Sequence, residues 1–228
     1  EIRNSKQIQF CKEFNDKGTI TQLLNPVKSI LVARIRKLMY RVTMNFCSHC
    51  GSRLTYGTPP GDDRDRFLCA ACGVVHYQNP RVVVGCIPEQ GERVLLCRRA
   101  IDPCYGKWTL PAGYLENGET VAAGAERETC EEAGAHIEAL VPYLMFNICH
   151  INQIYFMFRA RLTDVDFQPG KESLEVGLFT EAEVPWEQIA FRVISETLRA
   201  YFRDRSTGAF PFTVADIMPA PDQARRMP

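Results

Sequence analysis

Three glutamates in one short stretch have the spacing of a metal-binding surface. Glu128, Glu131 and Glu132 are three and four positions apart, so a helix here places their carboxylates side by side. Unpaired, these like charges repel unless cations neutralise them. Mg²⁺ or Mn²⁺ prefers oxygen ligands of this kind when substrate phosphates complete its coordination. A solvated acidic helix is the plain alternative, but the whole pattern favours a metal site.

The residues around these glutamates predict a helix that packs closely against other elements. Gly124 lies one turn before Glu128, where glycine weakens a helix, so we expect a close approach by a loop or ligand. Arg127 follows Glu119 by about two turns, which permits an ion pair that holds the preceding loop. Small residues form a stripe on the opposite side that can contact a sheet. They are Ala122, Ala125, Thr129 and Ala133.

Four cysteines have the spacing of a structural zinc site, two C-x-x-C pairs with 18 residues between them. The expected ligands are Cys47, Cys50, Cys69 and Cys72. Gly51 and Gly73 follow the pairs and permit the positive φ of a tight knuckle. Four thiolates leave no position for water, so this zinc is expected to fold the module and not to catalyse. A redox dithiol would not need a second pair, and His49 and His76 are interpreted as bystanders.

The remaining pattern predicts a mixed sheet between helices, because strands and helices do not alternate regularly. The predicted strands are 81–87 and 93–97, joined as a hairpin, then 137–143, 154–162 and 174–179. The predicted helices are about 119–133, which Gly134 ends, and about 192–203.

The composition limits which classes of protein this chain can belong to. The 228 residues have a formal net charge of zero, which gives no global attraction for nucleic acid or acidic membranes. Charged residues interrupt each apolar run, so no membrane span is expected. Ten cysteines without a signal peptide indicate reduced thiols and a cytoplasmic protein.

Four segments follow from these patterns. Residues 1–43 are basic, carry a net charge of +6 and leave −6 for the rest of the chain, which suits a cation site. This extension could be a surface helix, a targeting arm, or sequence upstream of a natural start at Met44. Residues 44–79 are then a zinc ribbon and 80–205 the main domain. Residues 206–228 are expected to be a C-terminal tail.

The residues from Gly113 to Gly134 follow the pattern G-x5-E-x7-R-E-x-x-E-E-x-G. This stretch resembles the Nudix box, with every charged and glycine position filled. Thr129 and Ala135 fill two apolar positions weakly, which affects packing and not ligands. The flanking W-T-L-P-A-G also looks like the family. The resemblance covers about residues 80–205.

The resemblance implies an α/β fold of the Nudix type, an α/β/α sandwich with a mixed sheet, preceded by a small four-cysteine zinc ribbon. It also implies a Mg²⁺- or Mn²⁺-dependent hydrolase that cuts the diphosphate bond of a nucleoside diphosphate linked to another moiety. Carried over by residue, Glu128 and Glu132 bind metal together with the backbone carbonyl of Ala112. Glu131 binds metal or helps to position water. The family also suggests a homodimer, which no residue here demonstrates.

A late loop often adds a carboxylate in this family. Glu172 is the favoured ligand and Glu175 the second, although either fits a solvated loop charge. The stretch S-Q-P-W-P-F-P of NADH pyrophosphatases is absent after the box. Residues 77–81, 108–116 and the Glu172 loop are more similar to ribbon-bearing members that act on ADP-ribose or FAD, so one of these dinucleotides, with release of AMP, is the expected substrate.

Other functions stay open from sequence alone. They include NADH or NAD pyrophosphatase activity, cap removal, clean-up of mutagenic nucleotides, and a nucleotide-sensing or nucleic-acid-binding protein that uses the ribbon. Nucleic acid is not the expected partner, because acidic residues dilute the basic ones in the ribbon. Aromatic residues that could stack a base or flavin are Tyr105, Tyr114, Phe146, Tyr155 and Phe156, although such residues are more often core.

Overall fold

The computed structural model describes residues 44–163 and 166–219, so the predictions for residues 1–43 lie outside it. The described chain divides into two compact units, residues 44–79 and 80–218. Among these residues, no helix combines the length and the apolar character that a membrane crossing needs.

The first unit is a small three-stranded antiparallel sheet with the order β1-β2-β3. Its strands are β1 (Thr55–Gly57), β2 (Arg66–Leu68) and β3 (Val75–His76). Phe67 on β2 is buried, and Tyr56 on β1 packs edge-on against it at 5.0 Å between ring centroids. With so little apolar surface enclosed, the hydrophobic effect alone cannot hold this unit.

The second unit contains an eight-stranded sheet whose main path has the order β10-β5-β4-β9-β8-β11. The strands are β4 (Arg81–Gln90), β5 (Arg93–Arg99), β6 (Trp108–Thr109), β7 (Ala112–Tyr114), β8 (Ile137–Ile148), β9 (Gln153–Leu162), β10 (Ser173–Phe179) and β11 (Thr213–Asp216). β4 and β9 pair in parallel, as do β8 and β11, while the other pairs are antiparallel. The predicted mixed sheet is confirmed, and each predicted strand lies within an observed one.

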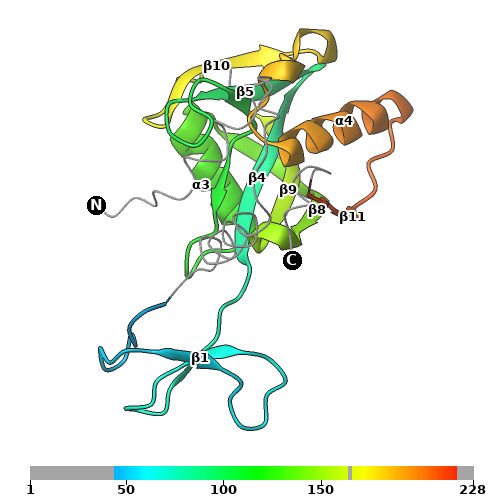
Figure 1. The fold of residues 1–228 in the computed structure, drawn as a ribbon. Coiled ribbons are helices and arrows are strands. Elements are labelled where there is room, and N and C mark those ends of the chain that lie inside the picture. Colours follow the sequence, from blue (N-terminus) through cyan, green and yellow to red (C-terminus); the bar gives the residue numbers. More distant parts are fainter. Residues whose placement is uncertain (1–43, 164–165, 220–228) are drawn as a thin grey trace, which may run out of the picture. The chain divides into compact units, whose positions relative to one another are not determined.

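Two helices lie on opposite sides of this sheet, α3 (Val121–Ala133) and α4 (Arg192–Thr207), as Figure 1 shows. The strand period of two explains the arrangement. Leu95 and Cys97 of β5 pack in a cluster with Ala133 of α3, whereas Val94 and Leu96 join the larger cluster with α4. Three short 3₁₀ helices, η1 (Cys149–Ile151), η2 (Glu181–Glu183) and η3 (Trp186–Gln188), complete the elements. The α/β/α sandwich is therefore confirmed.

The segment after α4 differs from the expected tail. Residues 213–216 form β11, which pairs with β8 from Leu144 to Asn147. The strand signal is weak here, because Thr213–Asp216 is short and mostly exposed. Ile217, directly after it, is buried in the cluster beneath α4. The sheet thus includes residues beyond 205.

Candidate active site and zinc centre

Local interactions define both ends of α3. The Thr120 side chain accepts a hydrogen bond from the Ala123 N–H at 3.1 Å, which caps the first turn. Gly134 ends the helix at φ 59° and donates its N–H to the Cys130 carbonyl at 2.8 Å. The helix begins two residues later than predicted because Glu119 belongs to the loop, where its Oε1 accepts the Glu116 N–H at 2.7 Å.

The predicted small stripe does contact the sheet. Ala125, Thr129 and Ala133 have no exposed surface. The Thr129 hydroxyl donates to the Ala125 carbonyl at 2.7 Å and lies 2.7 Å from the Cys86 sulfur, so this polar side chain is satisfied inside the core. A Cβ on Gly124 would lie 2.8 Å from Val84 and from Glu119, which confirms the close approach. The short helix–sheet distance positions the acidic face of α3.

Arg127 connects the loop before α3 with the acidic face. Its guanidinium donates to both oxygens of Glu119 at 2.8 and 3.0 Å, as the sequence indicated. It also donates to Glu128 Oε1 at 2.7 Å and to Glu131 Oε2 at 3.2 Å. The assumption that these carboxylates are unpaired in the absence of cations is therefore wrong for Glu128 and Glu131, because one arginine reaches both.

Glu132 is the most buried of the three carboxylates, with a relative exposure of 7%. Its Oε2 accepts the Ala112 N–H at 3.2 Å. Burial raises the pKa of its carboxyl to about 8, and the negative charges of Glu128 and Glu172 act in the same direction. Burial also raises the pKa of Glu128, against the influence of Arg127. A Cβ on Gly113 would overlap the Glu128 carboxylate, so glycine is needed at that position.

The late loop lies against the end of α3. The Gly170 N–H donates to the Glu132 carbonyl at 3.0 Å, and the Gln168 N–H donates to the Ala133 carbonyl at 2.9 Å. Glu172 follows, and its charge influences both Glu128 and Glu132. Glu175 lies on exposed β10 and pairs with Arg98 at 3.5 Å. The charge of Glu172 therefore acts on the acidic face of α3, whereas Glu175 is paired with Arg98.

Arg99 is a charged residue whose charge acts on Glu132, and the sequence did not predict its role. It is buried at the end of β5, and its Nε donates to the Pro103 carbonyl at 2.9 Å. Its charge opposes the raised pKa of Glu132 and that of Tyr155, which burial raises to about 12. Within the described ranges no carboxylate forms an ion pair with Arg99. The sequence signal for this residue is an arginine at the end of an otherwise apolar strand, which indicates a buried cation.

The aromatic candidates occupy different environments. Tyr114 accepts a hydrogen bond from Gln153 Nε2 at 2.9 Å and carries the Arg81 guanidinium over its ring at 5.2 Å. Tyr155 packs against the large core cluster, and Phe146 belongs to it. Tyr105 is exposed. Phe156 packs against two other phenylalanines, Phe158 and Phe212.

The four cysteines of the first unit converge as predicted. Their sulfur atoms lie within 4.8 Å of one another, with Cys47 and Cys72 at 3.7 Å and Cys50 and Cys69 at 3.4 Å. Gly51 and Gly73 both have φ of 74° and donate to the carbonyls of Cys47 and Cys69 at 2.9 Å. Hydrogen bonds with Ser52 lower the pKa of Cys50 to about 6. Four converging sulfurs fit a closed structural zinc ion.

His76 contributes to this centre in a way that the sequence did not indicate. Its Nε2 lies 3.3 Å from the Cys47 sulfur, so the ring can donate a hydrogen bond to that thiolate. The contact arises because β3 pairs with β2 beside the knuckles. Over residues 44–163 and 166–219, these four cysteines are the only group of three or more His, Cys, Asp or Glu side chains whose ligand atoms lie close enough together to hold an ion. The carboxylates of α3 do not converge in this way.

A mixed sheet between two helices, with a glutamate-lined helix after a glycine loop, defines the class of hydrolase folds to which this site belongs. The model of the NUDIX domain matches residues 79–200, and that of the Nudix N-terminal zinc ribbon matches residues 45–78. The chain therefore belongs to the Nudix hydrolase family.

Individual relatives support this assignment. A NUDIX hydrolase from Nitrosomonas europaea has a crystal structure with a TM-score of 0.74 and 52% identity, over 76% of this chain and 99% of that one. The 8-oxo-dGDP phosphatase NUDT18 of Homo sapiens is 33% identical over 110 residues, 46% of this chain and 33% of that protein. The NAD-capped RNA hydrolase NudC of Photobacterium profundum is 26% identical over 198 residues, 82% of this chain and 72% of that protein. The chain thus spans only about a third of NUDT18.

Proposed function

We propose that this protein is a Mg²⁺- or Mn²⁺-dependent hydrolase that cleaves the diphosphate bond of ADP-ribose or FAD and releases AMP. The observation that carries the proposal is the buried carboxyl of Glu132 and the partly buried carboxyl of Glu128, beside the backbone of residues 112–113. Burying two acids next to each other raises the pKa of both and costs stability. A cation shared with a diphosphate offsets this cost.

The proposed metal ligands are Glu128, Glu131 and Glu132, the carbonyl of Ala112, and Glu172 from the late loop, with Glu175 as the second choice there. Oxygen donors of this kind suit Mg²⁺ or Mn²⁺. When bound, such an ion would neutralise charge on the diphosphate and lower the pKa of a coordinated water. Arg127 donates hydrogen bonds to Glu128 and Glu131, so an ion held by these carboxylates would share them with its guanidinium.

The chain's own residues then have distinct tasks. The Ala112 N–H holds the Glu132 carboxylate in place, which fixes the orientation of a ligand before the substrate arrives. Arg99 has its Nε tied to Pro103, so its terminal nitrogens remain to pair with a phosphate oxygen. Glu131, whose side chain is 61% exposed, would accept a proton from water. Arg127 and Glu119 position the loop and do no chemistry.

The experiment is incubation with Mg²⁺ and a panel of substrates, followed by detection of AMP. ADP-ribose and FAD are expected to give AMP, and Glu132→Gln to lower kcat at least about a hundredfold. Glu126→Gln is the matched control, because Glu126 is exposed on the same helix. If no member of the panel yields AMP, the proposal is rejected.

The panel also includes NADH, which contains AMP, and 8-oxo-dGDP, whose hydrolysis is followed by release of inorganic phosphate because it contains no AMP. A relative named NAD-capped RNA hydrolase matches most of this chain, which supports NADH as the second candidate, although the NADH pyrophosphatase stretch is absent. Turnover of NADH with no turnover of ADP-ribose or FAD would transfer the proposal to that substrate class.

A further inference from the structure

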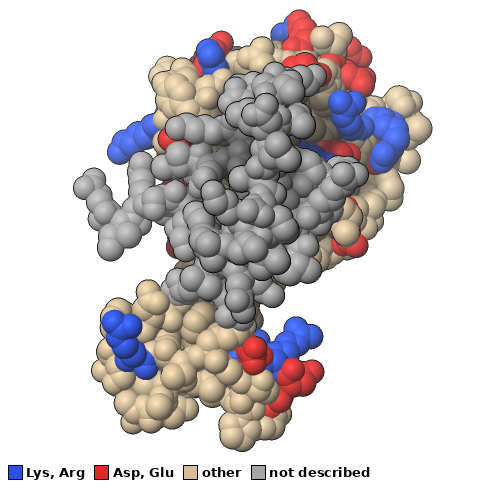
Figure 2. All heavy atoms as spheres, viewed as in Figure 1, with Lys and Arg blue, Asp and Glu red and all other residues tan. Residues whose placement is uncertain are grey.

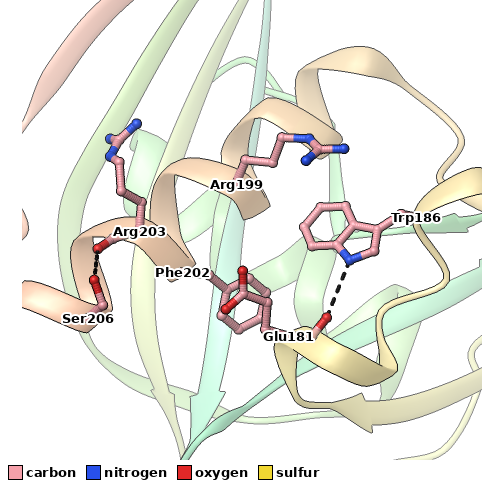
Figure 3. Close-up of a pocket in the computed structure, with 6 residues that line it drawn as sticks. All are labelled: Glu181, Trp186, Arg199, Phe202, Arg203 and Ser206. Atoms are coloured by element: carbon pink, nitrogen blue, oxygen red, sulfur yellow. Dashed lines mark hydrogen bonds between the residues drawn. The ribbon is translucent and has the colours of Figure 1, made fainter.

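The polar groups along α4 serve the packing of the fold. Trp186 donates its Nε1–H to the Glu181 carbonyl at 3.3 Å, and the Arg199 guanidinium lies over the indole at 4.7 Å, as Figure 3 shows. The Ser206 hydroxyl donates to the Arg203 carbonyl at 2.7 Å. These contacts join η2, η3 and α4 to one another. The contact that bears on the proposed active site lies at the other helix, at the end of α3.

The turn formed by residues 170–173 is joined to the end of α3 through backbone groups. The Gly170 N–H donates to the Glu132 carbonyl at 3.0 Å. Two residues earlier, the Gln168 N–H donates to the Ala133 carbonyl at 2.9 Å. The last carbonyls of a helix have no partner within the helix, so the loop satisfies two of them. One of the two belongs to Glu132, a proposed metal ligand.

Gly170 is the residue that permits this close approach. A Cβ at this position would overlap the carbonyl oxygen of Glu131 and lie 2.8 Å from its carbonyl carbon. These are backbone atoms of a helix, which cannot turn aside as the end of a flexible side chain can. The φ of Gly170 is not positive, so glycine is required here by space and not by the backbone conformation.

The same turn fixes the backbone of Glu172. The Ser173 N–H donates to the Gly170 carbonyl at 3.1 Å and closes the turn, in which Glu172 is the third residue. The Glu172 carbonyl accepts the Ala100 N–H at 2.8 Å, next to the end of β5. In Figure 2, several Asp and Glu side chains gather at the end of the second unit that carries β10. Charge alone therefore does not distinguish Glu172, whereas its position against α3 does.

We infer that Gly170 is a positioning residue of the proposed active site, because it lets the turn approach α3 and so holds Glu172 where its carboxylate can bind an ion together with Glu128 and Glu132. Gly170 touches neither ion nor substrate and acts through Glu172. In this position the charge of Glu172 acts on both other carboxyls. The inference rests on the proposed function and adds to it the contact that places the late carboxylate.

Ion binding is measured first, without substrate, by titrating the zinc-loaded protein with Mn²⁺ and following the electron paramagnetic resonance signal of the free ion. Gly170→Ala should raise the Kd for Mn²⁺ about tenfold, because the added methyl group pushes the turn and Glu172 away from α3. Glu172→Gln should raise it by the same factor. Gly57→Ala is the control, since a Cβ there meets open space, and its Kd should equal that of the wild type.

A double variant separates positioning from general damage. If Gly170 acts through Glu172, the variant that carries both Gly170→Ala and Glu172→Gln binds Mn²⁺ about tenfold more weakly than the wild type, as each single variant does. Release of AMP from ADP-ribose at subsaturating Mg²⁺ should follow the same pattern. Two factors that multiply to about a hundredfold would overturn the inference. Wild-type affinity for Mn²⁺ in Gly170→Ala would also overturn it.

Urea unfolding shows whether Gly170→Ala is folded. If it is not, one glycine inserted between Gly170 and Lys171 keeps the contact with α3 and lengthens the turn that carries Glu172. Mn²⁺ binding about tenfold weaker in this variant supports the inference, and unchanged binding overturns it. If the wild type releases no AMP from any substrate, the proposed function fails, whereas the Mn²⁺ titrations still decide whether Gly170 positions Glu172.

Discussion

The four-cysteine module and the glutamate face of α3, proposed to bind different ions, differ in the partners of their ligand side chains. In the four-cysteine module, residues 44–79, the four sulfurs already lie within 4.8 Å of one another. On the glutamate face of α3, Arg127 donates hydrogen bonds to Glu128 and Glu131. A closed sulfur site fits an ion that stays bound as part of the fold. The carboxylates of α3 already have a cationic partner, so an ion at this face would share them with Arg127.

The largest expected effect comes from removing a sulfur ligand. Cys69→Ser should unfold the module and release zinc, because zinc binding supplies on the order of 10 kcal/mol to modules of this kind and little apolar surface replaces it. Zinc stoichiometry and proteolysis between residues 44 and 79 measure the loss. Cys130→Ser, at an exposed position on α3, is the control. Full zinc content in Cys69→Ser would contradict the assignment of this ligand.

The glutamate face should respond to pH when no metal is present. The pKa of Glu132 is about 8 in the fold against an ordinary value of 4.5, so the folded chain keeps a proton that the unfolded chain loses. Its contribution is fully present below pH 4.5 and is lost as the pH rises toward 8, with a size of a few kcal/mol. Urea unfolding at pH 5 and pH 8 measures the decline. Glu132→Gln should flatten the decline and be the more stable protein at pH 8, and an unchanged slope in this variant would disprove the assignment.

Removal of the arginine sharpens the contrast between the two regions. Arg127→Gln leaves the partly buried Glu128 carboxylate without its cation, so we expect a loss of about 2–3 kcal/mol in the free energy of unfolding. The matched control is Arg161→Gln, because Arg161 pairs with Glu138 where both are exposed, and about 0–1 kcal/mol is expected there. Equal effects in the two variants would mean that Arg127 is an ordinary surface cation.

The smallest effect distinguishes the two late carboxylates. Glu172→Gln should lower turnover about tenfold, or about 1.4 kcal/mol, because its charge acts on both Glu128 and Glu132. Glu175→Gln should change turnover little, since Glu175 pairs with Arg98 on exposed β10. Steady-state kinetics with ADP-ribose compares them. A larger loss for Glu175→Gln would reverse the order of the two candidates.

The sequence predicted the elements that depend on short-range patterns. The period of α3, its glycine end and the spacing of its glutamates are local, and so are the knuckle glycines of the cysteine pairs. The sequence predicts the strands of the hairpin because two continuous apolar runs with β-branched residues flank a Gly91 turn, where φ is 56°. β11 was not predicted, because its four residues form a strand only by pairing with β8.

The sequence by itself therefore determined which residues could bind ions, since ligand chemistry and helix or knuckle spacing are properties of neighbouring positions. Only the tertiary structure decided which partners surround these residues: His76 beside Cys47, Arg127 on two carboxylates, and the charges of Arg99 and Glu172 acting on Glu132. The physical reason is that burial and charge at a point depend on strands and loops distant in sequence. The spacing in the sequence identifies the carboxylates, whereas the pKa of Glu132 is raised by the residues that pack around it.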